Sequence, residues 1–440
     1  MKNILILGAG LVSRPGIIFL LENKFKVTVA SRTLEKAQKM VQGFENGTAA
    51  QILVDDTRAL DALVKQHDII VSLLPWTHHI LVARSCLANN KHMVTTSYVS
   101  QEMKNLSDQA KAKNLLFLNE IGVDPGIDHM SAMKIIDEVH AENGKIRHFY
   151  SFCGGLPAPE DNDNPLGYKF SWSPKGVVLA SKNPARFLEN KEHINIKGED
   201  LFLNYRRETI KELGEFEVYP NRDSMPYKEI YGLKDAHTVM RGTYRNIGWC
   251  DTFKKIVDLG LVDDTPVSHL SNISFKKMMA TLPGIPENKN IKTAIAQKAG
   301  IAEDHFVIQN LEWLGLFSND PIPALDNYLD ILSEKLWEKL VYKPGEKDML
   351  VLRHTFVVEN QDGSEKTITS TLINYGIPFG DSSMARTVSL PLGIGIKLIA
   401  QGKIDLTGVQ IPIKKEIYTP VLKALEDLGI QMVEKTKPKP

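Results

Sequence analysis

Two glycines near the amino terminus follow a spacing that can bind a nucleotide phosphate. Gly8 and Gly10 come directly after the apolar run at residues 4–7, and Ser13 stands at the third position of the pattern G-x-G-x-x-G. In that pattern, glycine allows a tight turn and a close approach of the backbone to a pyrophosphate. A helix beginning near Val12 would direct free amide groups at the phosphate. The predicted contacts are Gly8, Gly10, Leu11, Val12 and Ser13. An ordinary strand-to-helix turn of a flavodoxin-like domain is the alternative.

The next apolar run, at residues 26–30, ends in Ser31, Arg32 and Thr33. An NAD-specific site usually has an acidic residue there, which accepts a hydrogen bond from the ribose 2′-hydroxyl. A guanidinium instead can bind a 2′-phosphate through charge-assisted hydrogen bonds, with the two neighbouring hydroxyls as further donors. These residues therefore predict NADP as the cofactor. A solvated arginine before a surface helix is the alternative.

Six apolar runs alternate with helical patterns over the first 119 residues, at 4–7, 26–30, 51–54, 68–74, 92–95 and 115–119. This alternation predicts an α/β fold with a doubly wound parallel sheet of the Rossmann type. Ligands of such sheets bind at the carboxyl ends of the strands. Further cofactor contacts are therefore expected in the loops that follow the strands, at Asp55, Asp56, Leu74, Pro75, Val123, Asp124 and Pro125.

Bulk properties exclude several classes of partner. The 440 residues suggest two or three domains, and 53 basic residues balance 53 acidic ones. This balance argues against nucleic acid or an anionic membrane as a partner, and no run of about 18 apolar residues occurs. Three distant cysteines favour a cytoplasmic protein without a structural metal.

His78 and His79 are adjacent, so their side chains should point apart on a helix, and we interpret them as structural or solvated rather than as metal ligands.

Several longer motifs from Asp124 onward resemble those of the saccharopine reductase family, the glutamate-forming saccharopine dehydrogenases. They lie at residues 124–129, 153–160, 164–173, 219–224, 241–245, 312–317, 346–349 and 382–385. The resemblance implies a Rossmann domain at 1–123 that is completed by 384–440. It also implies a mixed α/β substrate domain at 124–251 and 345–383, with a helical insertion at 252–344.

The resemblance also implies an activity. Glutamate and 2-aminoadipate 6-semialdehyde would condense to an imine that NADPH reduces to saccharopine, or the reverse, so the partners would be these small molecules. The implied substrate contacts are Ser97, Tyr98, Asp124, Trp172, Arg222, Thr243, Tyr244 and Arg245. Tyr244 departs from the family pattern, which usually has leucine at that position.

The residue types at these positions suit that chemistry. Saccharopine carries three carboxylates and two amines, and Arg222 and Arg245 can each bind a carboxylate bidentately. Asp124 can accept from an amine, or alternatively cap a helix before Pro125. Formation of the imine also needs a proton donor or acceptor, for which Tyr98, Asp124, His129 and Lys169 are candidates. The residue types alone do not choose among the four, and our prediction for the catalytic residues is Tyr98 and Asp124.

Two other functions remain open at the level of sequence. One is a related imine reductase that resembles carboxynorspermidine dehydrogenase, which would need fewer cations for carboxylates. The other is a catalytically silent NADP-binding sensor or scaffold. The sequence leaves the oligomeric state open, with a homodimer among the alternatives.

Overall fold

The computed structural model describes residues 2–268, 270, 272–282, 285 and 290–438. Contacts divide the chain into two compact units. The first unit comprises residues 2–145, 360–364 and 369–437, and the second comprises 146–359, 365–368 and 438. The first boundary between these units falls after Lys145, whereas the family resemblance implied a domain boundary after residue 123. The segment 252–344 belongs to the second unit.

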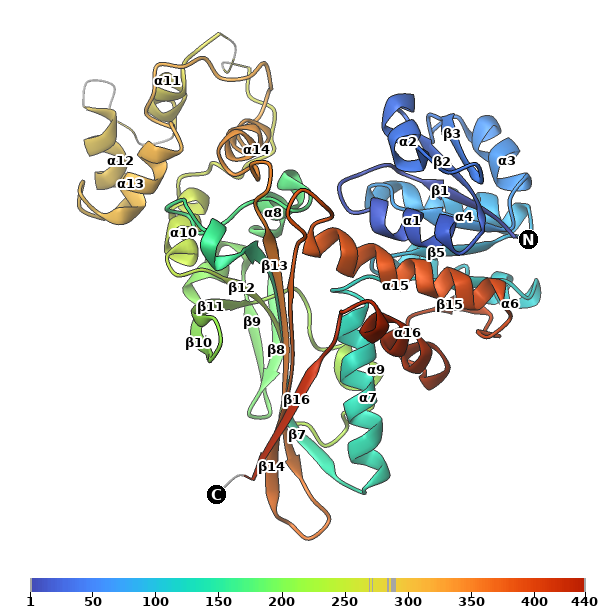
Figure 1. Cartoon of the computed structure of the whole chain (residues 1–440). Coiled ribbons are helices and arrows are strands. Elements are labelled where there is room, and N and C mark those ends of the chain that lie inside the picture. Colours follow the sequence, from blue (N-terminus) through green and yellow to red (C-terminus); the bar gives the residue numbers. More distant parts are fainter. Residues whose placement is uncertain (1, 269, 271, 283–284, 286–289, 439–440) are drawn as a thin grey trace. The chain divides into compact units, whose positions relative to one another are not determined.

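The first unit contains a seven-stranded parallel sheet in the order β15-β6-β5-β4-β1-β2-β3 (Figure 1). Its strands are β1 Asn3–Leu7, β2 Lys26–Ser31, β3 Gly47–Gln51, β4 Ile69–Ser72, β5 His92–Thr95, β6 Leu116–Leu118 and β15 Gly408–Gln410. β1 and β4 lie at the centre of the sheet, and their apolar residues are buried, as a sheet covered on both faces requires. The Rossmann fold is therefore confirmed.

The third strand differs from its prediction. It spans Gly47–Gln51 at the edge of the sheet, not residues 51–54, and Leu53 beyond it is 64% exposed. An edge strand has a sheet neighbour on one side only, so its residues need not form the apolar run that marks a central strand.

Helices connect these strands and complete the first unit. They are α1 Arg14–Glu22, α2 Leu34–Val41, α3 Thr57–Lys65, α4 His79–Ala88, α5 Gln101–Lys104, α6 Ser107–Ala112, α7 Ile127–Ala141, α15 Ser383–Ala400 and α16 Lys415–Asp427. The 3₁₀ turn Trp76–His78 precedes α4. α1 begins at Arg14, slightly later than predicted, with Pro15 in its first turn, where a missing amide hydrogen costs no helical hydrogen bond.

Helix α15, from the carboxyl-terminal part of the chain, packs directly on α1, as Figure 1 shows. At Gly16 a Cβ atom would lie 2.4 Å from the Ser389 carbonyl oxygen, and the Gly16 amide donates to Ser389 Oγ at 2.9 Å. Gly393 lies opposite, where a Cβ would be 3.3 Å from the Gly16 carbonyl oxygen. The two backbones can approach this closely only because both positions lack a side chain.

Replacing Gly16 by alanine is expected to destabilise the protein by about 1–3 kcal/mol, because the added methyl group forces α1 and α15 apart. The sign is informative, since glycine to alanine inside a helix ordinarily stabilises by about 0.5–1 kcal/mol. Urea unfolding of the protein without cofactor measures the change. Gly10→Ala is the matched control, because a Cβ there has no protein atom within 4 Å. Equal stability of the two variants would contradict the prediction.

The second sheet has nine strands, of which seven follow the order β10-β11-β12-β7-β13-β14-β16, while β8 pairs with β12 and β9 with β8. The strands are β7 Lys145–Pro157, β8 Ala185–Glu189, β9 Glu192–Ile196, β10 Arg206–Ile210, β11 Gly214–Pro220, β12 Thr238–Arg245, β13 Asp348–Glu359, β14 Glu365–Tyr375 and β16 Val433–Pro438. β7 and β12 are parallel, whereas β10, β11 and β12 are antiparallel. The sheet is therefore mixed, as the family resemblance implied.

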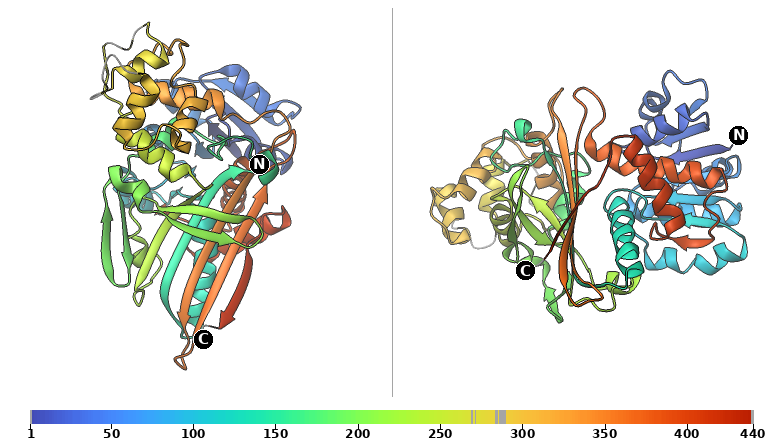
Figure 2. Two further views of the ribbon diagram at one scale, coloured as in Figure 1. Left: turned by 90° about the vertical axis from the view of Figure 1, so that its left-hand side faces the viewer. Right: turned by 60° about the horizontal axis from the view of Figure 1, so that its bottom comes forward.

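The helices of the second unit fall into two groups. The first group precedes residue 260 and comprises α8 Pro174–Ala180, α9 Tyr227–Ile230 and α10 Trp249–Asp258. The second group, in the helical segment, comprises α11 Phe275–Ala280, α12 Ile291–Ala299, α13 Phe306–Trp313 and α14 Tyr328–Lys339, of which α14 packs on α8. The second group lies together in both views of Figure 2. Within the described residues, no helix has the length and apolar character needed to cross a membrane.

Candidate functional site

The glycine turn after β1 is held by the two strands beside it. Gly8 has a φ of +119° and its amide donates to the Ala30 carbonyl at 2.9 Å. A Cβ on Gly8 would lie 2.7 Å from the Leu73 carbonyl oxygen, so glycine is required. The Ser13 hydroxyl donates to the Gly10 carbonyl at 2.8 Å and closes the turn before α1. Leu11 and Val12 lie between Gly10 and Ser13, and the side chain of Leu11 is exposed.

Ser31, Arg32 and Thr33 lie at the carboxyl end of β2. The Gln51 side-chain amide donates to the Arg32 carbonyl at 2.9 Å, and the Thr33 amide donates to Ser31 Oγ at 3.4 Å. Arg32 itself is exposed, and no carboxylate in the described part of the chain forms an ion pair with it. Its backbone is therefore held while its guanidinium stays available to an anion.

The predicted residues after β3 and β4 differ in their roles. Asp56 is the N-cap of α3, where its Oδ1 accepts from the Ala59 amide at 3.1 Å. Asp55 is exposed and lies 3.5 Å from His78 Nδ1. Leu74 is half-buried and Pro75 exposed at the end of β4. We therefore assign Asp56 a capping role, and Asp55 remains a candidate for the cofactor.

Ser97, Tyr98 and Asp124 come together at the carboxyl ends of β5 and β6. All three side chains are half-buried, and the Tyr98 hydroxyl donates to Asp124 Oδ1 at 3.2 Å. Ser97 Oγ lies 2.7 Å from His79 Nε2. A hydroxyl, a phenol and a carboxylate thus lie at the edge of the sheet where ligands of this fold bind.

A tight turn places Asp124. Gly126 has a φ of +146°, and a Cβ there would lie 2.1 Å from the Gly122 carbonyl oxygen. The Asp124–Pro125 peptide bond is cis, and Val123 and Pro125 are buried. The N-cap of α7 is Gly126, so the alternative interpretation of Asp124 as a helix cap is wrong.

The two other candidates for proton transfer are buried and paired. His129 is fully buried, and its Nε2 lies 2.8 Å from Glu120 Oε2. Lys169 is buried in the second unit, 2.7 Å from carboxylate oxygens of both Asp163 and Glu346. The hydrogen bond from Lys169, followed by that from Lys343, lowers the pKa of Asp163 to about 2. His129 and Lys169 are therefore buried as well as paired, whereas Tyr98 and Asp124 are half-buried, so Tyr98 and Asp124 stay the predicted pair.

Of the two predicted arginines, Arg245 ends β12 of the second sheet and Arg222 follows the end of β11. Pro220 on β11 pairs with Gly242 on β12, and the Asn221 amide donates to the Arg241 carbonyl at 2.9 Å. Arg245 pairs with Glu217 at one end of this ladder, and Arg222 follows β11 beyond its other end, so the two arginines lie toward opposite ends of the ladder. Two cations so placed suit different carboxylates of one extended molecule better than a single carboxylate.

Arg245 is 5% exposed and is surrounded by aromatic rings, which the sequence analysis did not identify. Its guanidinium carbon lies 4.9 Å from the ring centre of Tyr168, 5.1 Å from that of Trp249 and 5.9 Å from that of Tyr219. Nη1 donates to the Tyr244 carbonyl at 2.8 Å. Nε is buried and has no hydrogen-bond partner among the residues described, so one donor of the guanidinium is unsatisfied in this structure.

Burial raises the pKa of Tyr168 and of Tyr219, while the positive charge of Arg245 opposes this shift. Both phenols therefore stay neutral at physiological pH. The rings thus surround the guanidinium without adding a negative charge that would compete with a carboxylate ligand.

Arg222, the other predicted arginine, is exposed, whereas Arg245 is buried. Its φ is +56°, a left-handed conformation that is uncommon for residues with a side chain. Its carbonyl accepts from the Arg186 amide at 2.9 Å, which ties this bend to β8. Strained backbone of this kind is frequent where a side chain must be presented to a ligand.

Two further predicted contacts, Thr243 and Tyr244, are neighbours on β12, so their side chains point to opposite faces of the sheet. Thr243 is half-buried and shares the face of β12 with Arg245. Tyr244 points to the opposite face, fully buried against Phe152 and Phe216, and its hydroxyl donates to Glu208 at 3.1 Å. Tyr244 is therefore a core residue in this structure, and we do not retain it as a substrate contact.

Trp172 is half-buried in the segment before α8. A Cβ on Gly176 in α8 would lie 2.7 Å from the Trp172 ring, so glycine allows the indole to pack closely on the helix. Trp172 stays a candidate contact.

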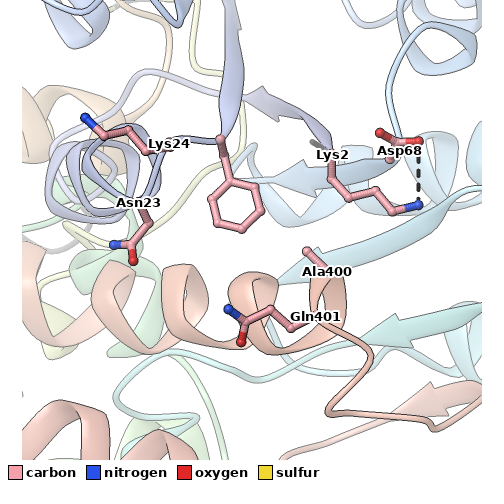
Figure 3. A pocket seen from close by; sticks show the side chains of 7 residues that line it. Lys2, Asn23, Lys24, Asp68, Ala400 and Gln401 are labelled. Carbon is pink, nitrogen blue, oxygen red and sulfur yellow. Dashed lines mark ion pairs between the residues drawn. The ribbon is translucent and has the colours of Figure 1, made fainter.

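A separate pocket of the first unit lies at the opposite end of the parallel strands (Figure 3). It is lined by Lys2, Asn23, Lys24, Phe25, Asp68, Ala400 and Gln401. Lys2 and Asp68, which precede β1 and β4, form an ion pair at 3.9 Å there. Because this pocket adjoins the amino ends of the strands, it is not the predicted cofactor site.

Comparisons with known proteins agree over the full chain. Family models described as the saccharopine dehydrogenase NADP binding domain and the saccharopine dehydrogenase C-terminal domain match residues 4–118 and 122–430. Saccharopine dehydrogenase [NADP(+), L-glutamate-forming] of Pyricularia oryzae is 42% identical over 444 residues, which cover 99% of each chain. The enzyme of the same name from Saccharomyces cerevisiae is 40% identical over 448 residues, again 99% of each chain. A solved structure of the apo, L-Glu-forming S. cerevisiae enzyme has a TM-score of 0.90 and 39% identity, and the match covers 99% of this chain and 100% of that one.

Proposed function

Because the chain belongs to the saccharopine dehydrogenase family, an oxidoreductase family of lysine metabolism, we propose that it interconverts saccharopine with glutamate and 2-aminoadipate 6-semialdehyde, using NADP(H). The observation that carries this proposal is the full-length match to L-glutamate-forming enzymes at 40–42% identity. The cations on β12 and after β11 support it, because each is suited to a carboxylate.

The residues at the carboxyl ends of β1 and β2 fit NADP(H). A Cβ on Gly10 would meet no protein atom within 4 Å, so this side of the turn is open to a pyrophosphate. The exposed guanidinium of Arg32 is suited to a 2′-phosphate. When bound, NADPH supplies the hydride that reduces the imine carbon.

Tyr98 and Asp124 are the proposed groups for proton transfer. When an amine adds to an aldehyde, the resulting carbinolamine must lose its hydroxyl group as water, which needs a proton. The Tyr98 hydroxyl, 3.2 Å from Asp124 Oδ1, is a suitable donor, and Asp124 is a suitable acceptor for a substrate ammonium. Arg222, Arg245, Thr243 and Trp172 are the proposed substrate contacts of the second unit.

An absorbance assay for reduced nicotinamide tests this function. Purified protein is incubated with saccharopine and NADP, and then with glutamate, the semialdehyde and NADPH. We expect reduction of NADP in the first mixture and oxidation of NADPH in the second. Turnover of a semialdehyde only with a diamine in place of glutamate would overturn the proposal, as would cofactor binding without any turnover.

Replacing Arg32 by alanine is expected to weaken binding of NADP(H) by about 1.5–3 kcal/mol, the contribution of a hydrogen bond to a charged group. Binding of NAD(H) should change little, because NAD lacks the 2′-phosphate. Fluorescence titration with each reduced cofactor measures both affinities. Arg84→Ala is the matched control, since Arg84 is an exposed arginine on α4 of the same unit. Equal losses for NADPH and NADH would show that Arg32 does not determine cofactor choice.

A further inference from the structure

A buried histidine joins two serines near the proposed site of chemistry. His79, the first residue of α4, has its Nδ1 2.8 Å from Ser72 Oγ and its Nε2 2.7 Å from Ser97 Oγ. Ser72 ends β4, and Ser97 follows β5. The imidazole thus connects a fully buried hydroxyl with the half-buried hydroxyl that is a proposed substrate contact.

The two hydrogen bonds determine which ring nitrogen carries the proton. His79 Nδ1 is the only hydrogen-bond partner of Ser72 Oγ among the described residues. A buried donor without an acceptor is rarer than an under-satisfied acceptor, so the Ser72 hydroxyl donates to Nδ1. The neutral ring then carries its hydrogen on Nε2 and donates to Ser97 Oγ. Burial, with a smaller effect of His78, lowers the pKa of His79 to about 4, which keeps the ring neutral.

The backbone around Ser97 is held by groups other than His79. The Ser97 amide donates to Thr95 Oγ1 at 3.3 Å, and the Glu120 amide donates to the Ser97 carbonyl at 3.2 Å. Glu120 Oε1 accepts from the Val99 amide at 2.9 Å. The bond from His79 is therefore not needed to place the chain, and its specific effect is on the Ser97 hydroxyl group.

We propose that His79 is a positioning residue that occupies a lone pair of Ser97 Oγ, so that the Ser97 hydroxyl hydrogen points away from the protein and donates to a substrate carboxylate. This inference rests on the proposed function and assigns a new residue to its site. His79 does not touch the substrate and acts through Ser97. A carboxylate is the expected partner because Ser97 Oγ accepts a hydrogen bond from His79 and its hydroxyl hydrogen is then free to be donated to an acceptor.

Three substitutions separate positioning from stability. Glutamine can place an amide nitrogen where Nε2 lies, asparagine can replace Nδ1 without reaching Ser97, and leucine removes both contacts. We expect His79→Leu and His79→Asn to raise KM for saccharopine roughly fivefold to tenfold, the effect of one hydrogen bond, with KM for NADP unchanged. His79→Gln should recover most of the loss. In a Ser97→Ala background, His79→Leu should change KM less than about twofold, because the two residues act as one unit.

His67 provides the matched control for a histidine that only bridges structure. It is buried in the same unit, with Nδ1 2.7 Å from the Leu63 carbonyl and Nε2 2.8 Å from Thr28 Oγ1, and it precedes the amino end of β4. His67→Leu should lower the thermal unfolding temperature and leave KM for saccharopine unchanged. If His67→Leu raises KM as much as His79→Leu does, or if His79→Gln is as impaired as His79→Leu, the proposal is wrong.

The tautomer gives a readout that does not depend on activity. Nitrogen-15 NMR of histidine-labelled protein, with the His79 signals assigned from the His79→Leu variant, should show a hydrogen on Nε2 from about pH 5 to about pH 9. A hydrogen on Nδ1 would overturn the role of His79 even if wild-type protein turns over saccharopine. Failure of wild-type protein to turn over saccharopine would instead overturn the proposed function itself.

Discussion

Replacing Arg222 by alanine is expected to lower kcat/KM for saccharopine by about thirtyfold to several thousandfold, equivalent to roughly 2–5 kcal/mol. The physical reason is that a carboxylate desolvated on binding would lose its bidentate partner. Because the reaction depends mainly on positioning, kcat should fall as well as affinity. Arg222 is exposed, so the substitution should leave the fold intact. Steady-state kinetics with saccharopine and NADP measure the effect.

Two further variants make this prediction specific. Arg222→Lys should recover little activity, since an ammonium cannot reproduce the planar pair of donors. Arg207→Ala is the matched control. Arg207 is also an exposed arginine of the second unit, on β10, and it forms a surface ion pair with Glu215 at 3.2 Å. The Arg207→Ala variant should keep wild-type kinetics. Wild-type kinetics in Arg222→Ala would rule out its role in binding a carboxylate.

Replacing Arg245 by alanine should produce a loss of kcat/KM in the same range, about 2–5 kcal/mol, and also lower stability. The second effect is expected because the guanidinium packs against the rings of Tyr168, Trp249 and Tyr219, and each cation–π contact contributes about 0.5–2 kcal/mol. Arg245→Lys keeps a cation among the rings, so it should recover stability in part while kcat/KM stays low. Thermal unfolding and kinetics on the same samples separate the two effects.

The placement of the two arginines toward opposite ends of the β11–β12 ladder leads to a test of whether they bind different carboxylates. Residues toward opposite ends of a ladder that share no ligand group should have additive effects on binding energy. The double variant Arg222→Ala, Arg245→Ala should therefore lose about the sum of the two single losses in the free energy of transition-state binding. A double variant no worse than either single variant would show that both arginines bind the same carboxylate.

The cofactor half of the molecule was largely predictable because its signals are local. A buried strand, a glycine turn and a helix follow one another within residues 3–22, and the alternation of strands and helices leaves few topologies for a parallel sheet. The carboxyl ends of the strands then locate the loops that carry Arg32, Ser97 and Asp124. The prediction for edge strand β3 was wrong by a few residues, because a strand with only one neighbour need not form an apolar run.

Contacts between distant parts of the chain were decided only by the tertiary structure. The sequence by itself determined the Rossmann sheet, the cation at the end of β2, and, through family motifs, Arg222 and Arg245. It did not determine that Gly16 would meet Ser389, that His79 would join Ser72 to Ser97, or that aromatic rings would surround Arg245. Tyr244 was assigned to the substrate from its position in a motif, whereas strand alternation turns its side chain into the core. Spacing in the sequence encodes local conformation, but the partners of a side chain depend on which distant segment packs against it.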